Sequence, residues 1–387
     1  MNLCGASNII AARNNSFCLI LSASAASRYR EAHAQRIRFA QPSLLAVFKH
    51  TGVCFGIPLR SSPYIIVLFR LDSREGISMI VYREISSLEQ DLGISAKTLY
   101  AVSNNLQGHY RKVLIPKHNG EYRKLSVPDE TLKKIQRQIA DVLLAHMPIS
   151  RYAKAYRFGS TTLKNAKPHI GKKVVLKLDI LHFFDSVRYS DVKDKVFPEE
   201  IYAENIRILL AMLCYYKDFL PQGAPTSPAI TNILMYEFDE LVGQWCRDHA
   251  ISYTRYCDDM TFSGDFDPSE VIRFVKLELK KIGFLLNEQK TRIQKQGQQQ
   301  SVTGIVVNEK PNASAAYRRK LRQELYYCQK FGVAEHLRKA DLTMSTEAYL
   351  QHLLGKVNYV LQIRGNDQEL IEARQWLCSQ LKTNKHP

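Results

Sequence analysis

Three carboxylates in this chain stand where metal-assisted chemistry on phosphates is expected. Asp179 directly follows a short apolar run, and the pair Asp258 and Asp259 lies between two strand-like runs. A carboxylate at a surface that binds nucleic acid repels phosphate unless a cation lies between them. Two Mg²⁺ ions about 4 Å apart, bridged by carboxylates, activate an attacking hydroxyl and stabilise a leaving oxygen. The pattern therefore predicts a two-metal site, with a plain hairpin turn as the alternative for the Asp-Asp pair.

Strands are predicted to position these acids. Residues 174–178 form an apolar run interrupted only by Lys177, and residues 252–256 and 260–263 form two more runs separated by a tight turn. Because Asp179 lies far from the pair in sequence, we expect adjacent strands, about 4.8 Å apart, to bring the acids together. Asp259 joins them only if the turn reorients it, since neighbouring residues of a strand point to opposite faces.

Two helices are predicted from capping and periodicity. Residues 129–147 begin with Asp129 as a candidate N-cap, and their apolar residues recur on one face. Residues 315–331 form a second helix that is basic at its start. The basic residues of the first helix, Lys133, Lys134 and Arg137, either meet a phosphate backbone or form an ordinary solvated face.

The charge of the chain points to a polyanionic partner. Its 387 residues include 54 Lys+Arg and 37 Asp+Glu, a net charge of +17, which favours nucleic acid first and an anionic membrane second. Hydrophobic residues make up 45% of the chain, which excludes wholesale disorder. No apolar run reaches the roughly 18 residues of a membrane span, so no membrane partner is expected. The eight cysteines form no C-x-x-C pair, which leaves zinc fingers unsupported and predicts reduced, intracellular thiols.

The first 78 residues differ from the rest of the chain. They carry nine Arg and Lys residues against three acids, are rich in Ser and Ala, and show no sustained helical or strand period. This composition is similar to that of a transit peptide, and residues 17–25 are similar to the apolar region of a signal peptide. We favour a third interpretation, a basic leader that is either disordered or translated upstream of a true start at Met79.

Five motifs, in order along the chain, resemble those of reverse transcriptases. They are R-K-L-S-V-P at residues 123–128, L-D-I-L-H-F-F-D-S at 178–186, L-P-Q-G-A-P-T-S-P at 220–228, Y-C-D-D at 256–259 and G-F-L-L-N-E-Q-K-T at 283–291. A single Y-x-D-D occurs by chance, whereas five motifs in the order of the family do not. The departures are small: Leu125 replaces the Ile of the first motif, and Cys257 stands where Ala is common.

Two further elements narrow the resemblance to bacterial retron reverse transcriptases. They are N-A-K-P-H at residues 165–169 and V-T-G at residues 302–304. The resemblance covers roughly Met79 to the C-terminus. It implies an α+β fold, a right-hand polymerase with fingers, a palm made of a small antiparallel sheet backed by helices, and a helical thumb. The expected boundaries are a leader at 1–78, N-terminal helices and fingers at 79–170, a palm with an interleaved fingers segment at 171–300, and thumb and C-terminal helices at 301–387.

The resemblance assigns the chemistry to the acids. Asp179, Asp258 and Asp259 are the implied catalytic residues and the implied ligands of two Mg²⁺ ions, with Asp179 and Asp258 binding both ions. Lys290 is implied to protonate the departing pyrophosphate. A surface lysine at the end of a strand is the alternative for Lys290.

Four residues are implied to bind the incoming nucleotide. The guanidinium of Arg123 suits bidentate contact with a triphosphate. Phe184 would lie beneath the sugar and collide with a 2′-OH, the group that separates RNA from DNA precursors, with core packing as its alternative. Gln222 and Gly223 would hold the nucleotide and template strand, since a glycine permits close approach of the backbone.

RNA binding is implied for the two retron elements and for the thumb. Asn165 and His169 either hydrogen-bond RNA or support the fingers, and the sequence leaves both roles open. Thr303, Arg318 and Arg319 are implied to lie in the thumb against the minor groove of the duplex, where phosphate contacts make affinity depend on salt.

The resemblance implies an RNA-directed DNA polymerase, a nucleotidyltransferase that acts in the bacterial cytoplasm. Its expected partners are a structured non-coding RNA that serves as template and primer, the DNA product, dNTPs and a separate effector protein. The expected product is branched RNA-linked single-stranded DNA (msDNA), begun at an internal guanosine 2′-OH, and the expected biological role is defence against phage, by analogy with the family.

Two alternatives remain. A group II intron reverse transcriptase usually carries further regions after the thumb, and only about 80 residues follow the V-T-G element. A silent RNA-binding protein of the same fold has no need of the three acids, all of which are present.

Overall fold

The computed structural model describes residues 82–116 and 120–382, together with the backbone of Thr383 and of five short strands before residue 82. Those strands form one sheet in the order β1-β2-β3-β4-β5. Their bounds are β1 Ile10–Ala11, β2 Ser16–Ile20, β3 Gly52–Gly56, β4 Ile66–Asp72 and β5 Gly76–Met79. The predicted leader at residues 1–78 lies outside the residues whose side chains are described, so its interpretation stays a prediction.

The chain forms two compact units and passes between them more than once. The first contains residues 1–150 and 182–238, and the second contains residues 151–181 and 239–387. Each unit is thus built from segments that are distant in sequence.

The second unit contains an antiparallel sheet around one central strand, β8 (Val174–Leu181). Strand β10 (Asp259–Gly264) pairs with β8 on one side and with β9 (Ser252–Tyr256) on the other. The opposite edge of β8 pairs with β11 (Leu285–Leu286) and β12 (Arg292–Lys295). The predicted strand at 252–256 is confirmed, and those at 174–178 and 260–263 are confirmed with slightly longer bounds.

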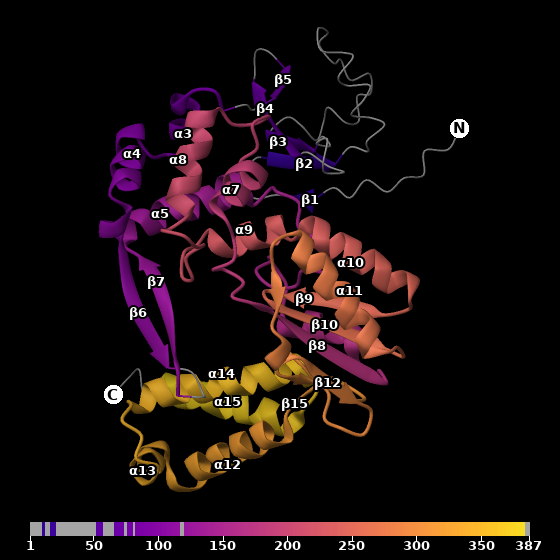
Figure 1. Cartoon of the computed structure of the whole chain (residues 1–387). Coiled ribbons are helices and arrows are strands. Elements are labelled where there is room, and N and C mark those ends of the chain that lie inside the picture. The colour runs from indigo at the N-terminus through magenta and orange to yellow at the C-terminus, as the bar shows by residue number, and fades with distance from the viewer. Residues whose placement is uncertain are drawn as a thin grey trace. The chain divides into compact units, whose positions relative to one another are not determined.

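Helices cover this sheet. Helix α10 (Tyr236–Asp248) and helix α11 (Pro268–Lys281) lie side by side (Figure 1). The rings of Trp245 on α10 and Phe274 on α11 are stacked, with their centroids 4.4 Å apart. The buried residues of α11, among them Val271 and Val275, recur at helical spacing, as expected for a helix with one face in the core. Before β8 lie the short helix α6 (Thr162–Ala166) and the turn η3 (Lys167–His169).

The C-terminal part of the second unit is mainly helical (Figure 1). A small sheet, β13 (Ser301–Val302), β14 (Ile305–Val306) and β15 (Asn312–Ala313), precedes four helices. The helices are α12 Ala315–Phe331, α13 Val333–Lys339, α14 Thr346–Arg364 and α15 Gln368–Thr383. The prediction of a helix at 315–331 is confirmed. Apolar side chains of all four helices and of the small sheet share one core.

The first unit combines helices with one hairpin. The hairpin pairs β6 (Tyr110–Pro116) with β7 (Tyr122–Pro128). The helices are α3 Ile85–Leu92, α4 Ala96–Asn104, η1 Leu106–His109, α5 Glu130–Gln138, η2 Ile139–Leu144, α7 Tyr189–Asp191, η4 Val192–Val196, α8 Glu204–Cys214 and α9 Ser227–Leu234. The Asp129 carboxylate caps α5 by accepting a hydrogen bond from the Leu132 N–H at 2.9 Å, as predicted. The predicted helix continues beyond α5 as the π-helical turn η2.

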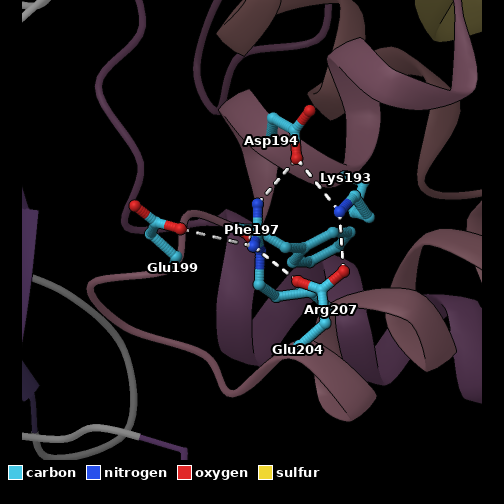
Figure 2. A network of polar contacts seen from close by, with 6 residues as sticks. All are labelled: Lys193, Asp194, Phe197, Glu199, Glu204 and Arg207. Carbon is cyan, nitrogen blue, oxygen red and sulfur yellow. Dashed lines mark hydrogen bonds and ion pairs between the residues drawn. The ribbon is translucent and has the colours of Figure 1, made fainter.

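A buried arginine organises the junction of η4 and α8 in the first unit. Arg207 donates hydrogen bonds to the carboxylates of Asp194 (2.7 Å) and Glu204 (2.6 Å) and to the carbonyl oxygen of Phe197 (2.8 Å). Figure 2 shows these contacts together with Lys193, which bridges the same two carboxylates. The network ties the irregular segment before α8 to the helix itself.

The mixed α+β class with a small antiparallel sheet is therefore confirmed. Within the described part of the chain, no helix is both long enough and apolar enough to cross a bilayer.

Candidate active site

The pairing of β8 with β10 brings Asp179 and Asp259 face to face. The two residues are direct cross-strand partners in the antiparallel register. Directly opposed residues point to the same face of a sheet, with their Cβ atoms about 4.5–5.5 Å apart. From the sequence, Asp259 was expected to join the other acids only if the turn reoriented it. The register places Asp259 on the same face of the sheet as Asp179.

Asp258 lies in the two-residue turn between β9 and β10. Its carbonyl oxygen accepts a hydrogen bond from the Ile180 N–H at 3.1 Å, which ties the turn to the strand that carries Asp179. The preceding residue, Cys257, has a φ of 62°, in the left-handed region that non-glycine residues rarely occupy. The turn thus holds an unfavourable backbone conformation directly before an acid.

Two residues of the 283–291 motif bind the Asp179 carboxylate. The Lys290 ammonium lies 2.8 Å from one carboxylate oxygen, and the Asn287 side-chain amide donates to the other at 3.1 Å. The Asn287 N–H also donates to the Asp179 carbonyl oxygen at 2.8 Å. Lys290 therefore lies at the acids, as its predicted role requires. Asn287 had no predicted role, and its position in the G-x-x-x-N-x-x-K-T motif is the signal that identifies it.

The pKa values of these groups reflect crowding of negative charge. Burial raises the pKa of the Asp258 carboxyl, and the charge of Asp179 raises it further. Burial also raises the pKa of Asp259 to about 6, with the charges of Asp258 and Asp179 adding to the effect. The hydrogen bond to Asp179 raises the pKa of Lys290, which keeps its ammonium charged at neutral pH.

The donor set fits a hard divalent cation. Mg²⁺ prefers carboxylate oxygens and usually binds one or two of them together with water and substrate phosphates. The charges of neighbouring acids contribute to the raised pKa values of Asp258 and Asp259, and a cation bound between them relieves this repulsion. Among the residues that the structure describes, no three His, Cys, Asp or Glu side chains form a ready-made metal cage.

The candidate nucleotide-binding residues lie in the first unit. The Leu220 N–H donates to the Phe184 carbonyl oxygen at 3.1 Å, and the Ser126 N–H donates to the Gln222 carbonyl oxygen at 3.0 Å. These bonds bring the 220–228 loop to Phe184 and to β7, the strand that carries the exposed Arg123.

Position 223 requires a glycine, because of its backbone conformation and because of the little space beside its Cα. Its φ is 120°, and a Cβ at this position would lie 3.0 Å from the Ser126 carbonyl oxygen. A larger residue would therefore push the loop away from β7. The ring of the half-buried Phe184 packs edge-on against Phe183 at 5.6 Å, so part of its surface contributes to the core.

The N-A-K-P-H and V-T-G elements meet inside the second unit. The Asn165 side-chain amide donates to the Thr303 hydroxyl at 3.3 Å, and that hydroxyl donates to the Thr162 carbonyl oxygen at 3.4 Å. Asn165 is buried and Thr303 is partly exposed. The two retron elements therefore form one structural contact.

His169 is fully buried against the side chains of Thr254 on β9 and Ser263 on β10. One ring nitrogen lies 2.7 Å from the Ser263 hydroxyl and the other lies 2.8 Å from the Thr254 hydroxyl. Burial lowers the pKa of His169 to about 3, so the ring is neutral. Because both nitrogens bind protein groups, the predicted hydrogen bonds from His169 to RNA do not fit this structure. The other interpretation, structural support, agrees with it, although the residues supported are β9 and β10 rather than the fingers.

The basic start of α12 is more accessible. Arg319 is exposed, and Arg318 is half-buried with its guanidinium 3.3 Å from the Ala313 carbonyl oxygen. Both residues belong to a stretch of four basic side chains on this helix, which suits contact with phosphate.

Sequence reasoning also missed a buried pair beneath the Y-C-D-D turn. Arg255 and Asp239 are both inaccessible to solvent, and their charged groups lie 2.6 Å apart. The available signal was an arginine in the interior of the predicted strand at 252–256, directly before the motif.

Comparisons with known proteins agree with the motifs. The family described as reverse transcriptase (RNA-dependent DNA polymerase) matches residues 115–307. The Retron Mx65 reverse transcriptase of Myxococcus xanthus is 31% identical over 76% of this chain and 71% of that protein. The Retron Ec86 reverse transcriptase of Escherichia coli is 28% identical over 72% of this chain and 88% of that protein.

Among solved structures, telomerase of Candida tropicalis in complex with a fragment of telomeric RNA aligns with a TM-score of 0.39 and 14% identity, over 71% of this chain and 55% of that chain. A foamy viral protease-reverse transcriptase in complex with double-stranded DNA aligns with a TM-score of 0.37 and 13% identity, over 79% of this chain and 49% of that chain. Similarities this distant say nothing about the roles of residues. The sequence relatives are closer and cover most of both chains. The chain belongs to the retron reverse transcriptases, which are RNA-directed DNA polymerases.

Proposed function

We propose that this polymerase copies a structured non-coding RNA into branched RNA-linked single-stranded DNA, starting from an internal guanosine 2′-OH. The observation that carries the proposed chemistry is the cross-strand pair of Asp179 and Asp259 beside the turn that holds Asp258, and the 2′-OH priming and branched product are proposed by analogy with the retron relatives. In a retron reverse transcriptase, three acids at one end of a sheet supply what nucleotidyl transfer needs from the protein.

Asp179, Asp258 and Asp259 are the proposed ligands of two Mg²⁺ ions. When bound, the ions supply activation of the attacking hydroxyl and stabilisation of the leaving oxygen. Lys290 neutralises Asp179 in the structure, at 2.8 Å. Its side chain is 61% exposed, so it is free to turn toward an incoming phosphate. A lysine is protonated at neutral pH, so Lys290 can donate a proton to the departing pyrophosphate.

The first unit supplies the proposed dNTP contacts. Arg123 would bind the triphosphate, since a guanidinium suits bidentate phosphate contact. Phe184 would exclude a 2′-OH, and Gln222 and Gly223 would hold the nucleotide and template strand. The exposure of Arg123 and the hydrogen bond between β7 and the 220–228 loop support this assignment.

The remaining contacts concern RNA. Arg318 and Arg319 are proposed to bind phosphates of the template-primer RNA, and Asn165, His169 and Thr303 to hold the elements around them in place. The fingers, palm and thumb boundaries given above, action in the bacterial cytoplasm, a separate effector protein and a role against phage complete the proposal. They follow from the family rather than from a contact in this chain.

The test is the nucleic acid that copurifies with the chain when it is expressed with its native flanking DNA. The material is treated with RNase and then with a 2′,5′-debranching enzyme and is resolved on a denaturing gel. Wild type is compared with Asp258→Asn, which keeps the shape of the side chain and removes its charge. Asp265→Asn serves as the matched control because this exposed acid pairs with Lys173 on the surface.

We expect DNA with wild type and Asp265→Asn, a shift of that DNA on debranching, and no DNA with Asp258→Asn. Unbranched DNA would contradict the proposed 2′-OH priming and would favour an intron-like reverse transcriptase. RNA alone from all three proteins would contradict polymerisation and would favour the silent RNA-binding protein.

A further inference from the structure

A buried ion pair lies directly behind the Y-C-D-D turn. The Asp239 carboxylate on α10 faces the Arg255 guanidinium on β9, and neither side chain is accessible to solvent. The Arg255 Nε donates to Asp239 Oδ1 at 2.8 Å and Nη2 donates to Oδ2 at 2.6 Å, which is a bidentate pair. The Tyr253 hydroxyl also donates a hydrogen bond to Asp239 Oδ1, at 2.8 Å.

The third nitrogen of the guanidinium reaches the turn itself. The Arg255 Nη1 donates to the Cys257 carbonyl oxygen at 2.9 Å. That carbonyl belongs to the peptide that joins Cys257 to Asp258, so its direction fixes how the chain enters Asp258. One planar group therefore links α10 to the peptide in front of a proposed metal ligand.

The turn needs such a restraint. A φ of 62° at a non-glycine residue is unfavourable and persists only where surrounding contacts hold it. The Cys257 thiol is buried and lies 3.5 Å from the Tyr156 hydroxyl, which holds the side chain, while Arg255 holds the carbonyl. Burying two charges is costly, and apolar residues would pack here at least as well. What the ion pair adds is the fixed direction of its donors, because a guanidinium presents its N–H groups in a rigid plane.

We propose that Arg255, oriented by Asp239, is a positioning residue of the polymerase: it fixes the Cys257 carbonyl and thereby the direction of the Asp258 carboxylate. It acts through the backbone and touches neither metal nor nucleotide. This inference rests on the proposed role of Asp258 as a metal ligand.

The test compares two conservative changes in the same buried network. Arg255→Lys keeps the charge but lacks the planar fork, so a lysine cannot bind Asp239 bidentately and reach the Cys257 carbonyl as well. Tyr253→Phe removes a hydrogen bond to Asp239 and leaves the contact with the turn intact. Each protein is assayed for primer extension on an RNA template, for the Mg²⁺ concentration that gives half-maximal rate, for binding of Mn²⁺ by electron paramagnetic resonance, and for its melting temperature.

For Arg255→Lys we expect kcat to fall roughly 10- to 100-fold, as for a modest misplacement of a reacting group. We also expect weaker Mn²⁺ binding, a several-fold higher Mg²⁺ requirement and a KM for dNTP within about twofold of wild type. For Tyr253→Phe we expect a lower melting temperature with unchanged kcat and Mn²⁺ binding. Wild-type kcat and Mn²⁺ binding in Arg255→Lys would overturn the inference, and so would equal losses in both variants, which would show a merely structural role.

Two further variants keep the outcome decisive. If Arg255→Lys does not fold, the double variant Arg255→Gln with Asp239→Asn replaces it, since it leaves no unpaired charge in the core, and the same results are expected. Asp258→Asn separates this inference from the proposed function. If it retains DNA synthesis, the metal-ligand role of Asp258 fails. If it loses synthesis while the Arg255 variants behave as wild type, only the positioning role fails.

Discussion

Two buried arginines, one in each unit, pair with carboxylates whose exposure to solvent differs. The Arg207 side chain is 8% exposed and pairs with the carboxylates of Asp194 and Glu204, which are 52% and 56% exposed. The Arg255 side chain is 0% exposed and pairs with Asp239, which is also 0% exposed. The first arginine thus reaches acids that remain hydrated, whereas the second meets an acid that has lost its water.

The difference follows from where each acid comes from. Asp194 and Glu204 lie on the segments that flank Arg207, and Lys193 shares them (Figure 2). Water and the neighbouring charges can replace any one of these contacts. Asp239 lies on a helix packed against the strand of Arg255. Water therefore cannot replace a hydrogen bond of this pair when one partner is removed. We therefore expect a redundant surface network in the first unit and a pair sensitive to any change in the second.

The largest expected effect is that of Asp239→Ala. The change leaves a guanidinium in the core without its carboxylate, and breaking a buried pair in this way costs about 3–5 kcal/mol. Urea unfolding monitored by circular dichroism measures the loss. The matched control is Asp265→Ala, which removes an exposed acid of the same unit. Equal unfolding midpoints for the two variants would contradict the contrast between buried and exposed pairs.

His169 extends the comparison to a buried base whose hydrogen-bond partners are two hydroxyl groups and not a carboxylate. Burial lowers its pKa to about 3, whereas a histidine in the unfolded chain has the usual pKa of about 6.5. Between these pH values the unfolded state binds more protons, so this contribution to stability is complete above about pH 6.5 and is lost as the pH falls.

By pH 5.5 the loss through His169 is expected to reach roughly 1 kcal/mol. The measurement is the free energy of unfolding of wild type and of His169→Gln at pH 7.5 and at pH 5.5. The variant is less stable at both values but lacks this part of the pH dependence. Parallel losses in the two proteins would show that the ring is not held neutral.

A smaller effect is expected for Asp194→Asn. The carboxylate lies 2.7 Å from Arg207 but is half exposed, and Glu204 remains 2.6 Å from the same guanidinium. Exposed pairs contribute about 0.2–1 kcal/mol, so the loss should stay below about 1 kcal/mol and should shrink in 1 M NaCl. A loss as large as that of Asp239→Ala would show that the Arg207 network is not redundant.

The smallest effect is expected for Glu199→Gln. This acid is 80% exposed and lies 3.9 Å from Arg207, at the limit of an ion pair. We expect its melting temperature to match that of wild type within experimental error. A clear drop would mean that the third acid of the network holds the arginine more firmly than the distances indicate.

Local patterns predicted the elements around the acids well. The strand at 252–256, the turn after it and the N-cap at Asp129 were all visible because alternation, turn residues and capping residues act over a few positions. The five motifs likewise identified the polymerase family, since they record the order of residues along the chain. What they left open was the place of Asp259 and the role of His169.

The sequence by itself determined the family, the three acids and the strands that carry them, because each depends on residues close together in the chain. Tertiary structure alone decided that Asp259 faces Asp179, that His169 is buried against β9 and β10 and that Arg255 meets Asp239. These outcomes depend on the register between distant strands and on the packing of a helix against them. A shift of one residue in register moves every side chain of a strand to the other face, and no local pattern records that choice.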